Sequence, residues 1–142
     1  MKGSAKSKYG LQFMVGLALR FGHGPSLVAT IADQQGLPPK FMRVLLGDLK
    51  AAGLISVQRG PNGGCELARH PSHITTLEVI EALEGPLSPP RAPADAPFSA
   101  QAVNELWARS VAAARHALHR TTLADLVARQ QALEVDSHGY SI

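Results

Sequence analysis

A proline-rich stretch in the second half of the chain is the feature that most limits its fold. Five prolines stand between residues 86 and 97, with almost no large apolar side chain among them. Proline lacks the backbone N–H and fixes φ, so neither a helix interior nor a central strand tolerates this spacing. We therefore expect an irregular connector over 86–98, between a domain at 1–85 and helices at 99–133, with a frayed tail at 134–142.

The first part of the chain predicts three helices. Apolar residues recur at helical spacing over 8–21, 27–35 and 38–52, and a glycine follows each stretch. Ser26 is positioned to cap the second helix, and two prolines suit the first turn of the third. The second and third helices, joined by a tight turn that contains Gly36, have the dimensions of a helix-turn-helix.

A β-hairpin and a fourth helix are expected next. Ile55 and Val57 alternate with polar residues, and a glycine-rich turn at 60–64 leads to a returning strand. The hairpin directly follows the helix-turn-helix, which is the place of a wing. Thr75 and Glu78 then have the spacing of a capping box and predict another helix.

A long helix is expected from Ser99 to about His119, and a short helix follows near Thr122. One apolar stripe runs along the long helix, while the first helices and the wing are expected to close the N-terminal core without it. The economical partner for the stripe is the same helix of a second subunit. The expected fold class is α+β, mainly α, a winged helix-turn-helix with a long C-terminal dimerisation helix. The stripe consists of Val103, Trp107, Val111, Ala114 and Leu118.

Charge is divided unevenly along the chain. Residues 1–70 hold nine basic and three acidic side chains, whereas residues 71–142 hold five basic and eight acidic ones. The first part therefore carries +6 and the second −3 at neutral pH. A basic segment attracts nucleic-acid phosphates and releases counterions when it binds. The alternative is that these charges only solvate the surface.

Composition and motifs exclude several classes of function. No apolar run approaches the roughly 18 residues of a membrane span, and Gln12 and Arg20 interrupt the apolar stretch near the N-terminus, so neither a membrane protein nor a signal peptide is expected. A single cysteine cannot form an internal disulfide, which favours the cytoplasm. No nucleophile turn or phosphate loop is present, so an enzyme is not expected.

The third helix carries the predicted contacts to DNA bases. In a helix-turn-helix the second helix enters the major groove, and here Lys40, Arg43 and Lys50 lie opposite its apolar face. The Arg43 guanidinium can pair with guanine through two hydrogen bonds, which discriminate by about 1–3 kcal/mol. The alternative is that Arg43 contacts only the DNA backbone. Arg59, just before the glycine-rich turn, suits insertion into a narrow minor groove.

A set of motifs across the first 85 residues is specific enough to resemble a known family. The set comprises Met1-Lys2 with Ser4, Lys6 and Tyr9, then 31–33 (Ile-Ala-Asp), 49–55 (Leu-Lys-Ala-Ala-Gly-Leu-Ile), 57–64 (Val-Gln-Arg-Gly-Pro-Asn-Gly-Gly), and 67–69 (Leu-Ala-Arg) with Pro71, Ile74, Val79 and Ile80. It resembles the Rrf2 family of winged-helix regulators of iron-sulfur assembly, nitric-oxide response and cysteine metabolism. From 98 to 130 only the helix pattern is similar.

The resemblance implies a homodimer crossed through the long helix, a partly palindromic operator of double-stranded DNA and, in most members, repression. It also implies that Lys40, Phe41 and Arg43 contact the major groove and Arg59 the minor groove. The full set of predicted DNA contacts is Lys6, Lys8, Lys40, Phe41, Arg43, Lys50, Arg59, Gly60, Asn62 and Gly63.

The sequence departs from the family where many members hold an iron-sulfur cluster on three cysteines. Residues 86–101 contain no cysteine, so a cluster of that type is not expected, and no other cofactor is predicted. A variant of the family uses an acidic residue and a histidine on the first helix, where Lys8 and Gln12 stand here. The effector, if the protein has one, is not identified by these positions.

Several alternatives stay open. Arg59, across the hairpin from Cys65, is hypothesised to lower the pKa of the thiol, whose oxidation would then weaken DNA binding. A pocket beside Trp107 is a candidate for a small apolar effector. His116 and His119, one helical turn apart, make an incomplete metal site, so no metal is expected. Finally, the winged helix is alternatively a non-catalytic module that binds protein instead of DNA.

Overall fold

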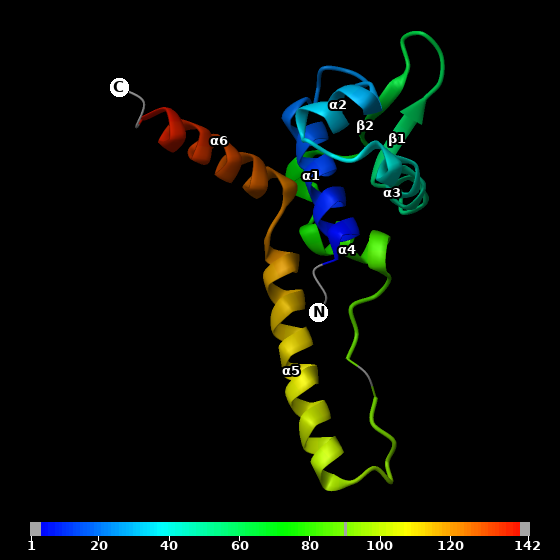
Figure 1. The fold of residues 1–142 in the computed structure, drawn as a ribbon, viewed down its shortest axis with the longest axis vertical. Coiled ribbons are helices and arrows are strands. Elements are labelled where there is room, and N and C mark those ends of the chain that lie inside the picture. Colours follow the sequence, from blue (N-terminus) through cyan, green and yellow to red (C-terminus); the bar gives the residue numbers. More distant parts are fainter. Residues whose placement is uncertain (1–3, 90, 140–142) are drawn as a thin grey trace.

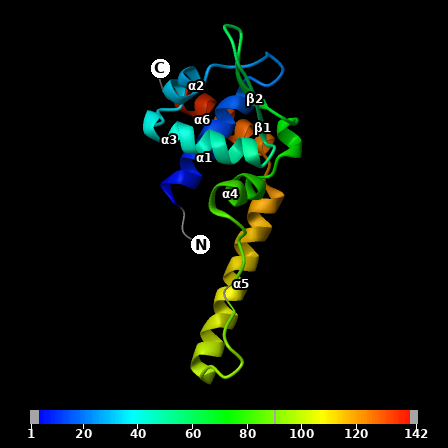
Figure 2. The same ribbon diagram turned by 90° about the vertical axis from the view of Figure 1, so that its right-hand side faces the viewer.

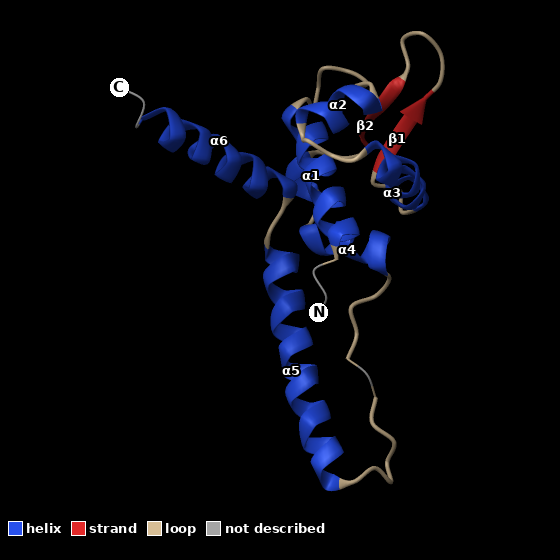
Figure 3. Ribbon diagram, viewed as in Figure 1, coloured by secondary structure: helices blue, strands red, loops and turns tan. Residues whose placement is uncertain are grey.

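The computed structural model describes residues 4–89 and 91–139, which form a mainly helical fold with one antiparallel pair of strands (Figures 1 and 3). It confirms the expected α+β class, mainly α, with a hairpin directly after a helix-turn-helix. Within the described residues, no helix is long and apolar enough to cross a membrane. The elements are α1 (Ala5–Leu19), α2 (Val28–Gln34), α3 (Pro39–Ala51), β1 (Ile55–Gln58), β2 (Gly64–Leu67), the 3-10 helix η1 (Pro71–His73), α4 (Thr76–Glu84), α5 (Phe98–Arg120) and α6 (Leu123–Gly139).

Helix α1 lies at the centre of the winged-helix part. Its Phe13 and Met14 are fully buried, and they share one core with Ile31 of α2 and with Leu45 and Leu49 of α3. Removal of this apolar surface from water is the main favourable term in folding. The core therefore fixes α2 and α3 against α1, as a helix-turn-helix requires.

The N-termini of α1 and α4 are both capped by hydroxyl side chains. Ser4 Oγ accepts the backbone N–H of Ser7 over 3.1 Å, so α1 begins directly after Ser4, earlier than expected. The hydroxyls of Ser4 and Ser7 also donate to the carboxylate of Glu84 at the end of α4. The predicted capping box of α4 is confirmed: Thr75 Oγ1 accepts from the Glu78 N–H (3.1 Å), and the Glu78 carboxylate accepts from the Thr75 N–H (3.2 Å).

The predicted cap of α2 is wrong, because Ser26 pairs with the hairpin instead. The Ser26 N–H donates to the Cys65 carbonyl over 2.9 Å, and the Cys65 N–H donates back to the Ser26 carbonyl over 2.8 Å. This pairing keeps Ser26 extended, so Leu27 becomes the N-terminal cap residue and makes no side-chain hydrogen bond. The segment before α2 thus lies along strand β2.

The start of α6 completes the N-terminal core, which the first helices and the hairpin do not close alone. Leu123 is fully buried within that core. Its N–H donates to the Ile74 carbonyl (3.0 Å), and the Thr76 N–H donates to the Thr121 carbonyl (2.8 Å), so the corner between α5 and α6 is bonded to the start of α4.

Helix α6 is longer than the expected short helix. It continues to Gly139, so residues 134–139 of the expected tail are helical, and only 140–142 lie outside the described residues. No glycine or proline interrupts the sequence between 123 and 138, and Gln130 bonds to Glu134 one turn later (3.0 Å), which supports the helix.

The connector runs from α4 away from the winged-helix part, and helix α5 returns beside it (Figure 1). The described residues of 86–97 contain no helix or strand. Arg115 of α5 joins this helix to α4 and to the connector. Its Nη1 donates to Glu81 Oε2 on α4 (3.0 Å) and to the carbonyl of Leu87 in the connector (2.8 Å). The Leu87 N–H donates to the same Glu81 oxygen over 2.9 Å. These bonds fix the base of α5 to α4.

Replacement of Leu123 by alanine is expected to lower the free energy of unfolding by about 2–5 kcal/mol, because the change leaves a cavity in the core. Urea denaturation followed by circular dichroism measures this loss. Val135→Ala is the matched control on the same helix, where the side chain is 70% exposed, and its expected effect is below about 0.5 kcal/mol. Equal losses in the two variants would contradict the packing of α6 on the core.

Candidate nucleic-acid interface

Helix α3 is divided into a buried face and an exposed cationic face. Met42, Leu45 and Leu49 are buried in the core, at spacings of three and four residues. Lys40 and Arg43 are exposed on the other side. Pro38 supplies no side-chain cap, Pro39 has no backbone N–H, and the Phe41 N–H donates to the Pro38 carbonyl over 3.2 Å. The positive end of the helix dipole adds to the charge of Lys40 at this terminus. The chain therefore presents the first turns of α3 to a negatively charged partner.

The wing stands on the same side of the molecule as α3. Figure 2 looks onto this side, with α3 across the front and the β1–β2 hairpin rising beside it. Arg59 follows β1 and is exposed, as is Asn62 in the turn. The turn needs glycine at position 63, since a Cβ there would lie 2.2 Å from the Gln58 carbonyl oxygen. Gly60 has a φ of 105°, which also favours glycine.

The exposed cations Lys40, Arg43, Lys50 and Arg59 form what we call the basic face. None of the four forms an ion pair with another described residue. Asp48 is the acidic residue of α3, and its carboxylate is paired with Lys6 of α1 over 2.7 Å. Within the described residues, no carboxylate therefore lies within ion-pair distance of these four cations.

Two predicted contacts from α1 lie on different sides of that helix. Residues 6 and 8 differ by about 200° around a helix, since each residue turns it by roughly 100°. Lys6 accordingly reaches Asp48 on α3, whereas Lys8 lines a groove between α1 and α6. The structure thus brings Lys6 to α3, the second helix of the helix-turn-helix, and places Lys8 elsewhere.

Phe41 has a structural contact as well as a predicted DNA contact. It is half-buried, and its ring centroid lies 5.3 Å from that of Tyr9 on α1. Lys40 Nζ lies 5.3 Å from the centroid of the Phe41 ring, close enough for a cation–π interaction. Phe41 therefore positions Lys40 and joins α3 to α1.

The apolar stripe of α5 is divided between the chain's own fold and the surface. Val111 is buried, and Ala114 and Leu118 are half-buried. Val103 and Trp107 are 61% and 51% exposed. The structure adds Leu106 (53% exposed) and Phe98 (87% exposed), which the sequence reasoning missed. The sequence contains a signal for Leu106 as part of this stripe, because it is three residues after Val103 and so lies on the same side of the helix.

The pKa hypothesis for Cys65 is wrong. Its side chain is fully buried, and burial, followed by the charge of Glu66, raises the pKa of the thiol to about 11. Arg59 does not lower it, because the residue opposite Cys65 in the hairpin is Val57, while Arg59 lies beyond the strand. Cys65 is therefore a poor thiolate donor in the folded chain.

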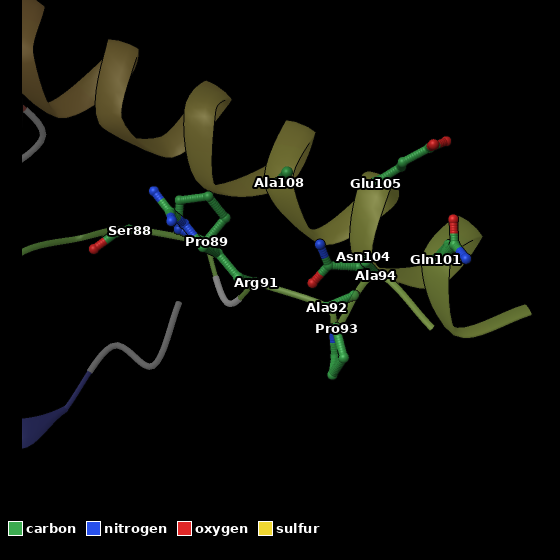
Figure 4. A pocket seen from close by; sticks show the side chains of 10 residues that line it. All are labelled: Ser88, Pro89, Arg91, Ala92, Pro93, Ala94, Gln101, Asn104, Glu105 and Ala108. Atoms are coloured by element: carbon green, nitrogen blue, oxygen red, sulfur yellow. The ribbon is translucent and has the colours of Figure 1, made fainter. Parts of the chain in front are cut away.

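Two pockets lie between the connector and α5. One, of about 430 Å³, includes Trp107 and Val103 and is the candidate site for a small apolar effector. Figure 4 shows its larger neighbour, of about 550 Å³, in which Asn104 points toward the connector while Glu105 points away. Alanines and prolines line about half of this second pocket, and polar or charged side chains line the rest.

A helix-turn-helix with a cationic second helix and a wing on the same side is the structure of a winged-helix DNA-binding protein. The family model of Rrf2, described as an iron-dependent transcriptional regulator, matches residues 3–129. The chain therefore belongs to the Rrf2 family and is a DNA-binding transcriptional regulator.

Known members of the family share most of their length with this chain. It is 39% identical over 126 residues to the HTH-type transcriptional regulator CymR of Bacillus subtilis, across 89% of each chain. The solved structure of CymR (YrzC), the global cysteine regulator of B. subtilis, is similar with a TM-score of 0.79 and 37% identity, over 91% of this chain and 98% of that one. IscR of T. potens is similar with a TM-score of 0.76 and 33% identity, over 92% and 88%. The matches are to regulators and not to enzymes, as predicted.

The residues present do not fit an iron-sulfur cluster held by three cysteines of the connector. The chain has one cysteine, Cys65, and it is buried in strand β2, far in sequence from residues 86–101. Across 4–89 and 91–139, no three histidine, cysteine or acidic side chains gather to hold a metal ion. His70 and His73 lie close, with ring centroids 5.9 Å apart, but no third such side chain joins them.

At pH 8, Cys65 of the folded chain is expected to react with 5,5′-dithiobis(2-nitrobenzoate) about a hundredfold more slowly than in urea. Burial blocks access and the raised pKa leaves little thiolate, whereas the unfolded thiol titrates near its ordinary value. Release of thionitrobenzoate measures both rates, and the single cysteine leaves the signal unambiguous. Similar rates in the two states would contradict the burial of this thiol.

Proposed function

We propose that this regulator is a repressor that binds a partly palindromic duplex operator as a homodimer. The observation that carries the proposal is the basic face, in which α3 and the wing present cations on one side of the molecule. We assign base contacts to Arg43 and Lys40, a minor-groove contact to Arg59, and backbone contacts to Lys50. Gly60, Asn62 and Gly63 allow the wing to approach phosphate closely.

The dimer is proposed to form through the exposed half of α5. Val103, Leu106 and Trp107 lie on one side of a helix that projects from the fold, and a second copy can bury them. Two copies related by a twofold axis would present their α3 helices to half-sites about one DNA turn apart. Repression and a cytoplasmic location are taken from the family resemblance and the single cysteine.

Arg43→Ala is expected to relax the preference for one base pair by about 1–3 kcal/mol, because the bidentate contact to guanine is lost. Lys50→Ala is expected to weaken binding to all duplexes evenly and to reduce the salt slope by about one. Selection from random duplexes followed by titration at several salt concentrations measures both. Arg109→Ala on α5 is the control. An equal loss for every sequence with Arg43→Ala would make Arg43 a backbone contact.

Trp107→Asp is expected to shift the chain from dimer to monomer, because a charge would be buried in the α5 interface. Sedimentation equilibrium measures the shift, and circular dichroism checks that the fold is retained. Arg109→Asp, on another side of the same helix, should leave the dimer intact. A dimer that survives Trp107→Asp would place the interface elsewhere.

A winged helix that binds protein instead of DNA makes a different salt prediction. Duplex binding through the basic face should fall steeply between about 50 and 200 mM salt, by orders of magnitude when several phosphates are contacted. Absent or salt-insensitive duplex binding would favour the protein-binding alternative.

A further inference from the structure

A groove between α1 and α6 lies apart from the basic face and from the exposed half of α5. It is open to solvent and has a volume of about 480 Å³, within the roughly 300–1,000 Å³ of typical small-molecule sites. Its walls come from two helices that are far apart in sequence and from Gln35 after α2. We call it the α1–α6 groove.

The groove follows α6 from Leu126 to Leu133, where the helix becomes steadily more exposed. Leu123 is fully buried and Leu126 is half-buried, whereas Leu133, which still lines the groove, is 51% exposed and Val135 is 70% exposed. Figure 1 shows α6 leading away from the body of the molecule. The two helices therefore diverge and leave a wedge that the chain does not fill.

The Gln35 side chain forms one end of the groove and packs against α1 at Gly16. A Cβ on Gly16 would lie 2.7 Å from Ile31 Cγ2 and 3.1 Å from Gln35 Cγ. Only glycine lets the Gln35 side chain pack this closely on α1. The amide of Gln35 is thus held at the groove, where it can serve as a hydrogen-bond donor.

The lining combines an apolar floor with two cations. Leu11 and Val15 of α1 face the groove together with Leu126 and Leu133 of α6. Lys8 from α1 and Arg129 from α6 also line it, and both are exposed. No aspartate or glutamate is among the lining residues.

The glutamine side chains add polar contacts without changing the sign of the charge. Gln12 and Gln130 line the groove on opposite helices. Glu134, outside the lining, accepts the side-chain N–H of Gln130 over 3.0 Å and so holds that amide in place. Two like charges across an apolar floor repel each other, and an anion between them would be attracted to both.

We infer that the α1–α6 groove binds a small organic anion with an apolar body. The apolar body would lie on Leu11, Val15 and Leu126, and a carboxylate or sulfonate would accept charge-assisted hydrogen bonds from Lys8 and Arg129. A nucleic-acid backbone fits less well, because its sugar and phosphate groups offer little apolar surface to the leucines.

The groove is one helix away from the recognition helix. Residues of α1 on either side of Lys8 in the sequence contact α3, through the Tyr9 and Phe41 rings and through the 2.7 Å ion pair of Lys6 with Asp48. An anion that alters the position of α1 would therefore alter α3. This second step, in which the groove is an effector site, rests on the proposed DNA-binding function.

The binding test uses the full chain and two matched fluorescent probes. The anion is 8-anilinonaphthalene-1-sulfonate, and N-phenyl-1-naphthylamine is nearly the same apolar body without the charge. Lys8→Gln and Arg129→Gln are each expected to weaken the anion about tenfold, the loss of one charge-assisted hydrogen bond, and to leave the neutral probe unchanged. Arg109→Gln and Arg120→Gln on α5 are the matched controls.

Two results would overturn the site. The first is an affinity for the anion that Lys8→Gln and Arg129→Gln leave unchanged, or that the α5 controls lower equally. The second is no binding of the anion to the wild-type chain. In that case, a change of sedimentation on Leu133→Asp would show that a second copy covers the groove.

The effector test measures duplex affinity with and without the sulfonate. Wild-type affinity is expected to change severalfold when the groove is filled, and Arg129→Gln, which lies off the basic face, should bind duplex normally but lose this response. An unchanged wild-type affinity at saturating probe would overturn the effector role. Failure of the proposed function is distinguishable, since a wild-type chain that binds no duplex could still bind the probe.

Discussion

The burial of α1 is the constraint on which the rest of the structure depends. Every residue of this helix from Phe13 to Ala18 is buried, so that stretch is removed from water on several sides at once. Glycines make this possible: a Cβ on Gly10 would lie 2.2 Å from Leu83 of α4, and Gly16 meets Ile31. Because α2, α3, α4 and α6 all pack on one helix, the recognition helix has a fixed position without a large sheet behind it.

The sequence allowed most local structure to be predicted, because caps, periodicity and turns are local properties. The capping box of Thr75 and Glu78 and the glycine-rich wing are examples, and the helix-turn-helix followed from the spacing of apolar residues and glycines. The order of charged residues on α3 also placed the basic face correctly on its exposed side. These features require no knowledge of which segments meet in space.

The features that could not be predicted all arise from contacts between distant segments. The sequence predicts Ser26 as a helix cap, but in the fold its backbone pairs with that of Cys65. The same pairing buries Cys65, so its thiol pKa rises where Arg59 had been expected to lower it. Likewise, nothing near Leu123 in the sequence indicates that it fills a core formed by residues 13–83. Lys6 and Lys8 have different surroundings because different helices cover the two sides of α1, and the sequence alone does not show which helices these are.

The Arg115 junction has a consequence for the connector. Since Arg115 and Glu81 fix the base of α5, and the α5–α6 corner is bonded to α4, the connector need only span the distance between its ends. Proline also restricts φ in the unfolded chain, so the five prolines lower the conformational entropy that this segment loses on folding. Substitutions between the prolines that leave the bonds of the Leu87 backbone in place are therefore expected to be nearly neutral for folding. A lineage can exchange the chemistry carried there, cysteines included, while the winged helix stays unchanged.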